Sequence, residues 1–113
     1  MINPTVQNAI VYDQTAVSVN TSAVTIDSWS TSTYRSAKYV ISVANTSTNE
    51  FQATEALIVH NNVNAFIKAD SVFSGAALIM TFTATVSTNN VILQGIGAAN
   101  NNTVKVHRVY ITV

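Results

Sequence analysis

The fold is decided by the sequence YRSAKYVISVAN-TSTN-EFQATEALIVH, which spans residues 34–60. Its first and last parts are long runs rich in residues that favour β-strands, and the four residues between them favour turns. Two such runs around a short polar linker are the pattern of an antiparallel hairpin. We therefore predict that residues 34–45 and 51–60 form paired strands of one sheet.

This hairpin also carries a carboxylate among apolar side chains. In its second run, alternate positions place four apolar residues on one face: Phe51, Ala53, Leu57 and Val59. Glu55 lies in the middle of this row, and a carboxylate on a core-facing row must be paired or lie at the rim. The first run supplies two cations, Arg35 and Lys38. The pattern therefore predicts a structural ion pair of Glu55 with Lys38 or Arg35.

The composition indicates one domain with an unusually uncharged surface. The chain has 113 residues, of which 9% are charged, against about 25% in ordinary soluble domains. Its polar residues are mainly 15 Thr, 11 Ser and 13 Asn. The formal net charge is zero. With no basic cluster, binding to nucleic acid through several phosphate contacts is not expected.

Other classes are excluded by what the sequence lacks. It contains no cysteine, so disulfides and thiolate metal sites are ruled out. The amino terminus has no signal-peptide pattern, and the longest apolar run, residues 76–80, is too short to span a bilayer. We expect a protein that is made in a cytoplasm and has no membrane partner.

Strand patterns recur along the whole chain, separated by polar turns. The expected strands are residues 6–12, 16–20, 24–29, 34–45, 51–60, 65–69, 78–86, 91–96 and 104–113. A helix from residue 66 to residue 73 is the alternative for one of them, although that segment is short and uncapped. The spacing predicts an all-β fold, a single antiparallel β-sandwich or jelly-roll-like domain. Residues 1–24 would form an extended N-terminal arm with the first short strands, and residues 25–113 the sandwich.

An enzyme is not expected, because the chain has few groups for catalysis. It has five acids and two histidines, and no His-x-His or His-Glu pair. Asp13, Asp27 and Asp70 lie near expected strand ends, where exposed aspartates are common. His60 precedes a turn and is best explained as a hydrogen-bonded turn residue. We therefore predict no catalytic residue, no metal site and no cofactor.

A carbohydrate-binding β-sandwich is a second class to weigh, because such modules stack sugars on exposed aromatic rings. Trp29 is the sole tryptophan, and the tyrosines are scattered: Tyr12, Tyr34, Tyr39 and Tyr110. A place in the core or in an interface explains each of them more simply.

A structural or assembly protein has positive support. A small β domain with few charges lacks the usual protection of its strand edges against association. Uncharged Thr, Ser and Asn side chains also lose little entropy when a contact orders them. We therefore expect the chain to associate with itself, with a surface that suits lattice contacts.

Three segments resemble a known family. They are Arg35-Ser-Ala-Lys-Tyr39, Phe51-Gln-x-x-Glu55-x-Leu-Ile-Val-His60 and Val104-Lys-Val-His-Arg-Val-Tyr-Ile111. Together they look like a β-sandwich module of tailed-bacteriophage virion proteins, which occurs in head, neck, baseplate or fibre components. The turn after His60 usually looks like Asp-Gly in such modules, and here it is Asn61-Asn62. The resemblance covers about residues 25–113 and implies architecture and a virion setting, with no catalytic residues to carry over.

Among virion roles, a short chain without a fibre-like repeat favours a non-enzymatic capsid decoration (cement) protein bound to the major capsid protein. Decoration in the family that the chain resembles commonly follows local three-fold positions, so the resemblance implies a homotrimer. Its N-terminal arm would dock through four apolar anchors: Val6, Ile10, Val11 and Tyr12. The alternative is a tail, neck, baseplate or fibre component of the virion.

Overall fold

The computed structural model describes residues 9–13 and 17–113. All regular elements in these residues are strands. They are β1 (Ala9–Asp13), β2 (Val17–Val19), β3 (Val24–Ser30), β4 (Tyr34–Asn45), β5 (Glu50–His60), β6 (Ala65–Phe73), β7 (Met80–Ser87), β8 (Asn90–Gly97) and β9 (Asn102–Thr112). The predicted all-β fold class is confirmed.

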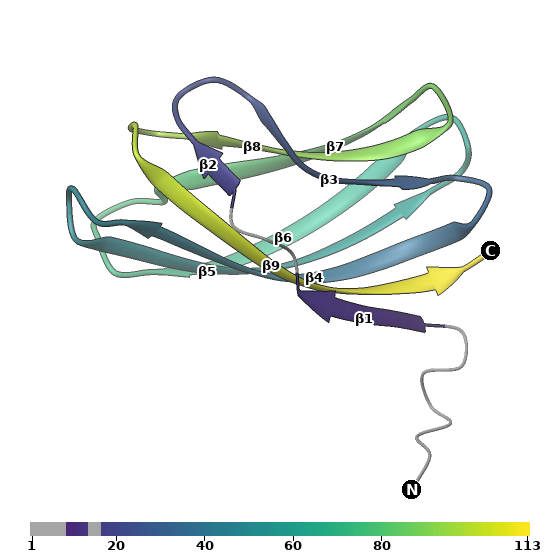
Figure 1. The fold of residues 1–113 in the computed structure, drawn as a ribbon, viewed down its shortest axis with the longest axis horizontal. Helices are drawn as coiled ribbons and strands as arrows, with labels where there is room; N and C mark the ends of the chain where they lie inside the picture. Colours follow the sequence, from purple (N-terminus) through teal and green to yellow (C-terminus); the bar gives the residue numbers. More distant parts are fainter. Residues whose placement is uncertain (1–8, 14–16) are drawn as a thin grey trace, which may run out of the picture.

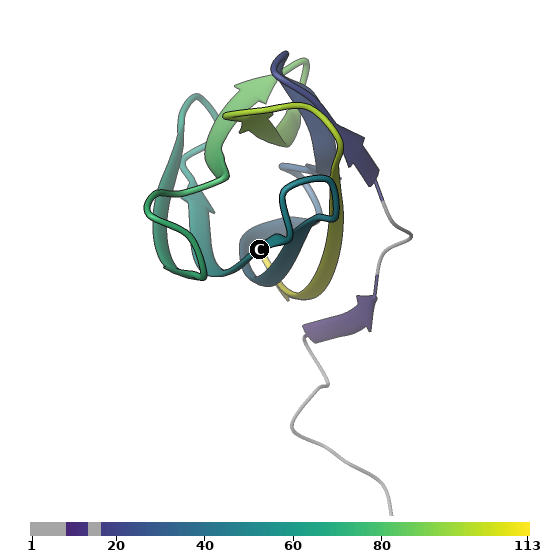
Figure 2. The same cartoon turned by 90° about the vertical axis from the view of Figure 1, so that its left-hand side faces the viewer.

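The strands form two antiparallel sheets that face each other (Figures 1 and 2). The large sheet has the order β1-β9-β4-β5-β6, with β2 also paired to β9, and the small sheet has the order β3-β8-β7. The hairpin of β4 and β5 lies inside the large sheet, where Tyr39 is opposite Ala56, and β9 pairs with the other edge of β4. The architecture is the predicted antiparallel β-sandwich.

The first two strands join the large sheet through the same neighbour. β1 pairs with residues 107–111 of β9, and β2 pairs with residues 102–104. The proposed anchors Ile10, Val11 and Tyr12 lie in β1, whereas Val6 lies outside the described residues. Docking of this segment on a partner stays a prediction.

Asparagine explains how tight turns are made with few glycines. Five described non-glycine residues have a positive φ. Four of them are asparagines in the connections between strands: Asn49, Asn62, Asn89 and Asn101. Asn tolerates the left-handed region better than most residues. In the turn after β5, the side-chain Oδ1 of Asn61 also accepts hydrogen bonds from the backbone N–H groups of Val63 and Asn64. This turn leads into β6, so the strand interpretation of residues 65–69 is confirmed and the helical alternative is wrong.

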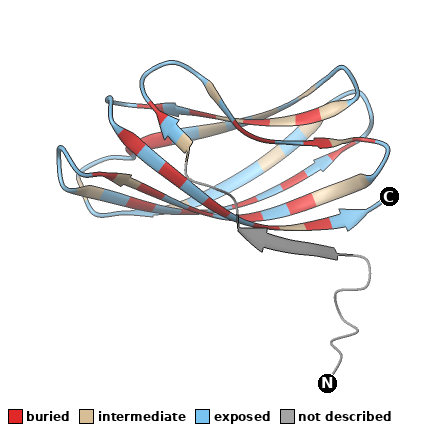
Figure 3. Ribbon diagram, viewed as in Figure 1, coloured by how far each residue is buried: buried red, intermediate tan, exposed pale blue. Residues whose placement is uncertain are grey.

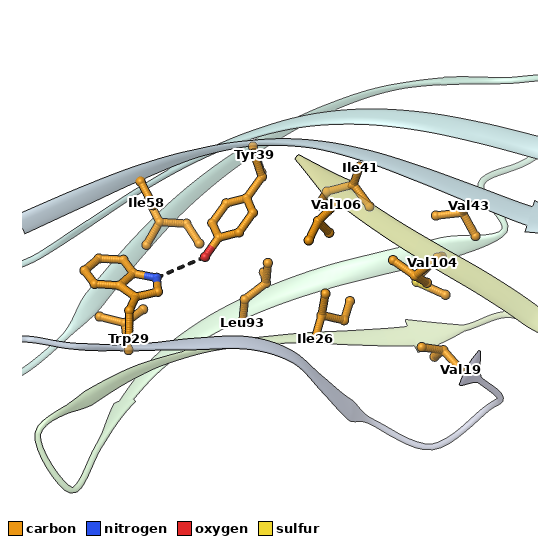
Figure 4. Close-up of a cluster of buried hydrophobic side chains, with 14 of the residues drawn as sticks. Val19, Ile26, Trp29, Tyr39, Ile41, Val43, Ile58, Leu93, Val104 and Val106 are labelled. Carbon is orange, nitrogen blue, oxygen red and sulfur yellow. Dashed lines mark hydrogen bonds between the residues drawn. The ribbon is translucent and has the colours of Figure 1, made fainter. Parts of the chain in front are cut away.

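The core lies between the two sheets. Buried residues alternate with exposed ones along most strands (Figure 3). Figure 4 shows Tyr39, Ile41 and Ile58 of the large sheet pointing toward Trp29, Ile26 and Leu93 of the small sheet. Because both sheets contribute fully buried side chains, burial of this layer is the main stabilising contribution to the fold.

A β-bulge in β3 breaks the alternation. The register with β8 shifts between Thr25 and Asp27, so Ile26 and Asp27 both point into the core although they are neighbours. Gly95 of β8 provides the space, because a Cβ atom there would lie 2.6 Å from Cδ1 of Ile26. Asp27 is therefore buried, and the expectation of an exposed strand-end aspartate is wrong.

The face of β5 that we predicted to meet the core points outward. The buried row consists of Gln52, Thr54, Ala56, Ile58 and His60, and the exposed row contains Phe51, Ala53, Glu55, Leu57 and Val59. A period of two separates the rows but does not decide which one is buried. The more polar row is inside because its polar groups are hydrogen-bonded there. Gln52, for example, accepts from the backbone N–H groups of Ile79 and Met80 and donates to the carbonyl of Met80.

Candidate functional site

The outward side of β4, β5 and β6, which we call the outer face, exposes many large apolar side chains. They are Val40 on β4, Phe51, Leu57 and Val59 on β5, and Phe66 and Val72 on β6. Leu57 is 58% exposed and Val72 is 76% exposed. The strand registers place Val59 opposite Phe66 and Ala53 opposite Val72. Exposed apolar side chains in this number make the outer face a candidate interaction site.

Four charged residues cross the middle of the outer face. The Lys38 Nζ atom lies 3.6 Å from a carboxylate oxygen of Glu55, and the Lys68 Nζ atom lies 3.7 Å from one of Asp70. The predicted pairing of Glu55 with Lys38 is therefore present, but both side chains are more than half exposed. Exposed pairs of this kind contribute at most about 1 kcal/mol. The prediction that Glu55 lies on a core-facing row is wrong.

Shallow hollows follow the same face. One of about 390 Å³ lies between β5 and β6 and is lined by Leu57, Val59, Phe66 and Lys68, among others. Another of about 340 Å³ is lined by Val40, Glu55, Asp70 and Val72, among others. Their linings are mainly apolar with charged groups at the margins, which suits a packed partner surface.

Arg35 contacts His60 instead of Glu55. Its Nη1 atom donates a hydrogen bond to the carbonyl oxygen of His60, at 3.0 Å. Nε2 of the buried His60 ring lies 2.7 Å from the carbonyl oxygen of Tyr34, and its Nδ1 accepts from the backbone N–H of Asn62. These contacts fit one neutral tautomer, with the proton on Nε2. His60 is thus the hydrogen-bonded turn residue that the sequence indicates.

A buried polar cluster lies between the sheets. Asp27 of β3 forms an ion pair with Arg108 of β9, and both side chains are less than a tenth exposed. The other carboxylate oxygen of Asp27 accepts hydrogen bonds from the hydroxyls of Tyr39 and Tyr110, at 2.7 and 2.6 Å. Trp29 Nε1 donates to the Tyr39 hydroxyl at 3.0 Å, the bond drawn in Figure 4. The cluster links the two sheets across the core.

Burial dominates the acid–base behaviour of this cluster. It raises the pKa of the Asp27 carboxyl, and hydrogen bonds from Tyr110 and Tyr39 counteract part of that rise. Burial also raises the pKa of both tyrosine hydroxyls, and contact with Asp27 raises it further. It lowers the pKa of Arg108, whose ordinary value is so high that the group stays charged. The arrangement is that of a structural network with protonated tyrosines.

The sequence contained a signal for this cluster that the strand-end interpretation of Asp27 overlooked. Arg108 alternates with Val104, Val106 and Tyr110, so a cation lies on an otherwise apolar row. An apolar row with one cation requires a buried anion nearby. Asp27 is two residues from the sole tryptophan and is that anion.

The aromatic residues divide between core and surface. Trp29, Tyr39 and Tyr110 are at most 4% exposed, as the core interpretation predicts, so their rings are not free to stack on a sugar. Phe51 and Phe66 are about half exposed, on the outer face.

Within residues 9–13 and 17–113, no group of three or more His, Cys, Asp or Glu residues could hold a metal ion. Nor does the described part of the chain contain a helix that could cross a membrane.

Comparison with known proteins gives a match in fold. No protein-family model matches this chain, and no curated protein matches it in sequence. The tailspike protein gp49 of Acinetobacter baumannii bacteriophage Fri1, a capsular polysaccharide depolymerase, matches 96% of this chain with a TM-score of 0.60 at 14% identity. The tailspike protein of Acinetobacter baumannii phage AM24 matches 100% of it with a TM-score of 0.58 at 9% identity. The chain spans 18% and 28% of the lengths of these two proteins.

These matches correct two predictions. Assignment to capsid decoration is wrong, because the two solved structures reported above that share the fold are tailspike proteins. Exclusion of enzymes is also contradicted, because the Fri1 tailspike, which contains this fold, is a depolymerase. The coarser part of the resemblance holds, since the fold is one that bacteriophage virion proteins contain.

Proposed function

We propose that this chain is a β-sandwich component of a bacteriophage tail, of the tailspike or fibre type, and that it is located in the virion. The observation that carries the proposal is the fold match, which covers 96% and 100% of this chain within two tailspike proteins. The match extends over both sheets, so it is more than a shared hairpin.

The outer face supports a role inside a larger assembly. Its exposed Leu57, Phe66 and Val72 would be unfavourable on a free domain, and they become favourable when a partner covers them. A tail component is in permanent contact with neighbouring subunits, which provides such a cover.

The location of the chain on the virion tests this proposal. Antibodies raised against the purified chain, coupled to gold and imaged on intact virions, should label the tail. Label distributed over the head would overturn the proposal. Absence of the chain from purified particles, checked by mass spectrometry of their proteins, would overturn it equally.

Contact with a capsular polysaccharide is a second candidate function, favoured by two observations. The Fri1 tailspike acts on such a polymer, and Phe51 and Phe66 expose aromatic rings of the kind on which sugars stack. Incubation of the purified chain with the capsular polysaccharide of the host should then retard the chain in affinity electrophoresis or shorten the polymer. Phe66→Ala should reduce either effect, whereas an unchanged result with Phe66→Ala and with Phe51→Ala would exclude this face as the sugar site.

A further inference from the structure

We propose that the outer face is a self-association surface on which a second copy of this chain docks face to face, with its strands antiparallel to those of the first. The proposal concerns the surface and its occupant, and it stands independently of the location of the chain in a virion. It is carried by the order of charged and apolar side chains across β4, β5 and β6.

The charges form two adjacent rows of opposite sign. Lys38 is opposite Leu57, which is opposite Lys68, so these positions form one row with two cations. Glu55 is opposite Asp70, two residues further along β6 from Lys68, and these form the next row with two anions. All four side chains are more than half exposed. The four charges therefore cancel in sum, but along the strands the positive row and the negative row follow each other in a fixed order.

A two-fold axis that lies between these rows and parallel to them makes the face complementary to itself. Rotation about it places the cationic row of one copy over the anionic row of the other, with Lys68 over the partner's Asp70. A parallel arrangement would instead place cations over cations, which is unfavourable. A closed two-fold contact of this type uses the same patch on both copies.

The apolar residues fit the same axis. On one side of the charged rows lie Val59 and Phe66, which are opposite each other on β5 and β6. On the other side lie Ala53 and Val72, which are also opposite each other. The rotation brings the larger pair of one copy onto the smaller pair of the other. Such a contact buries apolar surface in sheet-on-sheet packing, about 10 Å between sheets.

The size of the face sets the expected affinity. Three strands of about ten residues cover roughly 450 Å² at ~4.8 Å between strands and ~3.3 Å per residue. This is below the roughly 800 Å² per partner of a standard interface, so we expect a weak dimer that forms at high protein concentration.

A charge-reversal experiment tests the proposal. Because interfaces of this size bind weakly, the measurement needs a high protein concentration, about 100 µM. Sedimentation equilibrium at that concentration should give the wild-type chain a mass near twice 12.1 kDa. An acidic variant, Lys38→Glu with Lys68→Glu, should be monomeric because the face then carries only negative charge. A basic variant, Glu55→Lys with Asp70→Lys, should be monomeric for the opposite reason. An equimolar mixture of the two variants should recover the dimer mass.

Cross-linking tests the geometry of the dimer. It distinguishes the proposed contact from association of the charge variants through their opposite net charges alone. The chain has no cysteine, so Leu57→Cys introduces a single thiol next to the proposed axis. A short bis-maleimide should link two Leu57→Cys copies, in the wild-type background and in the mixture of charge variants. Val63→Cys is the matched control, because the turns of antiparallel copies would lie roughly 35 Å apart at ~3.4 Å per residue.

Four outcomes would overturn the proposal. They are a wild-type chain that stays monomeric, a dimer that persists in either charge variant, a mixture that does not re-form dimers, and a Val63→Cys variant that cross-links as well as Leu57→Cys. Thr83→Glu on β7 is a folding and charge control, because Thr83 is exposed and lies on the small sheet, away from the outer face. Its dimer mass should equal that of the wild type.

Discussion

On β5 the more polar row of side chains is buried and the more apolar row is exposed, which is the reverse of what hydropathy alone predicts. The inner row contains Gln52, Thr54 and His60, and the outer row contains Phe51, Leu57 and Val59. The inner polar groups are all hydrogen-bonded, so their burial has no large desolvation cost left uncompensated. The outer apolar groups have no cover within the described residues. The comparison shows that hydrogen bonding to distant segments, more than side-chain hydropathy, selected the buried row.

The same contrast applies to charge. The inner pair of Asp27 and Arg108 is buried, and two tyrosine hydroxyls donate hydrogen bonds to Asp27. The outer pair of Lys38 and Glu55 is exposed to water. Loss of a partner inside should therefore have a large energetic effect, and loss of a partner outside a small one. The following predictions test this difference, beginning with the largest effect.

Asp27→Ala should destabilise the fold most. It leaves the buried guanidinium of Arg108 without its anion and removes the acceptor of two tyrosine hydroxyls. We expect a loss of about 3–5 kcal/mol in the free energy of unfolding, measured by urea denaturation. A loss below about 1 kcal/mol would mean that the cluster is hydrated in solution and would contradict its burial.

Gln52→Leu should cause the next largest loss in the free energy of unfolding. Leu fills a similar volume, but two backbone N–H groups and one carbonyl of residues 79–80 lose their partner. Buried unsatisfied groups of this kind should cost about 2–3 kcal/mol in total. Phe51→Leu, one residue away on the outer row, is the control and should change stability by less than about 0.5 kcal/mol. Equal effects of the two substitutions would remove the distinction between the faces.

Alkaline pH should affect the inner cluster in a defined direction. The pKa values of Tyr39 and Tyr110 are raised in the folded state, so both hydroxyls keep their protons when an unfolded chain has lost them. Stability that is fully present below about pH 10 should therefore fall as the pH rises above it. Urea titrations at several alkaline pH values measure the slope. The slope should be shallower for Tyr110→Phe, and an identical slope would show that Tyr110 ionises normally in the folded state.

Much of the architecture could be predicted from local patterns. The limits of β4 agree with the expected residues 34–45, because alternation and flanking turn residues define a strand without reference to the rest of the chain. β6 continues to Phe73, beyond the expected residue 69, since the first turn-forming pair is Ser74-Gly75.

The parts that failed depend on distant contacts. The orientation of β5 depends on Gln52 meeting residues 79–80, and no local pattern records that meeting. The burial of Asp27 depends on a bulge whose space is provided by Gly95. The outer face could not be recognised as exposed until the orientation of β5 was known, so its exposed apolar side chains became visible only in the structure.

The smallest expected effect is that of Glu55→Ala, and it separates the two faces most simply. If Glu55 were on a core-facing row, its removal would leave a buried cation and cost about 3–5 kcal/mol. On the outer face, its partner Lys38 is 54% exposed and remains hydrated when the carboxylate is removed. We therefore expect a change below about 0.5 kcal/mol in urea denaturation of the dilute, monomeric chain. Lys38→Ala should give the same small value, and the double variant should show little coupling between the two positions. A loss above about 2 kcal/mol for Glu55→Ala would indicate that the outer face is covered in solution by another part of the chain or by a second copy, even at low concentration.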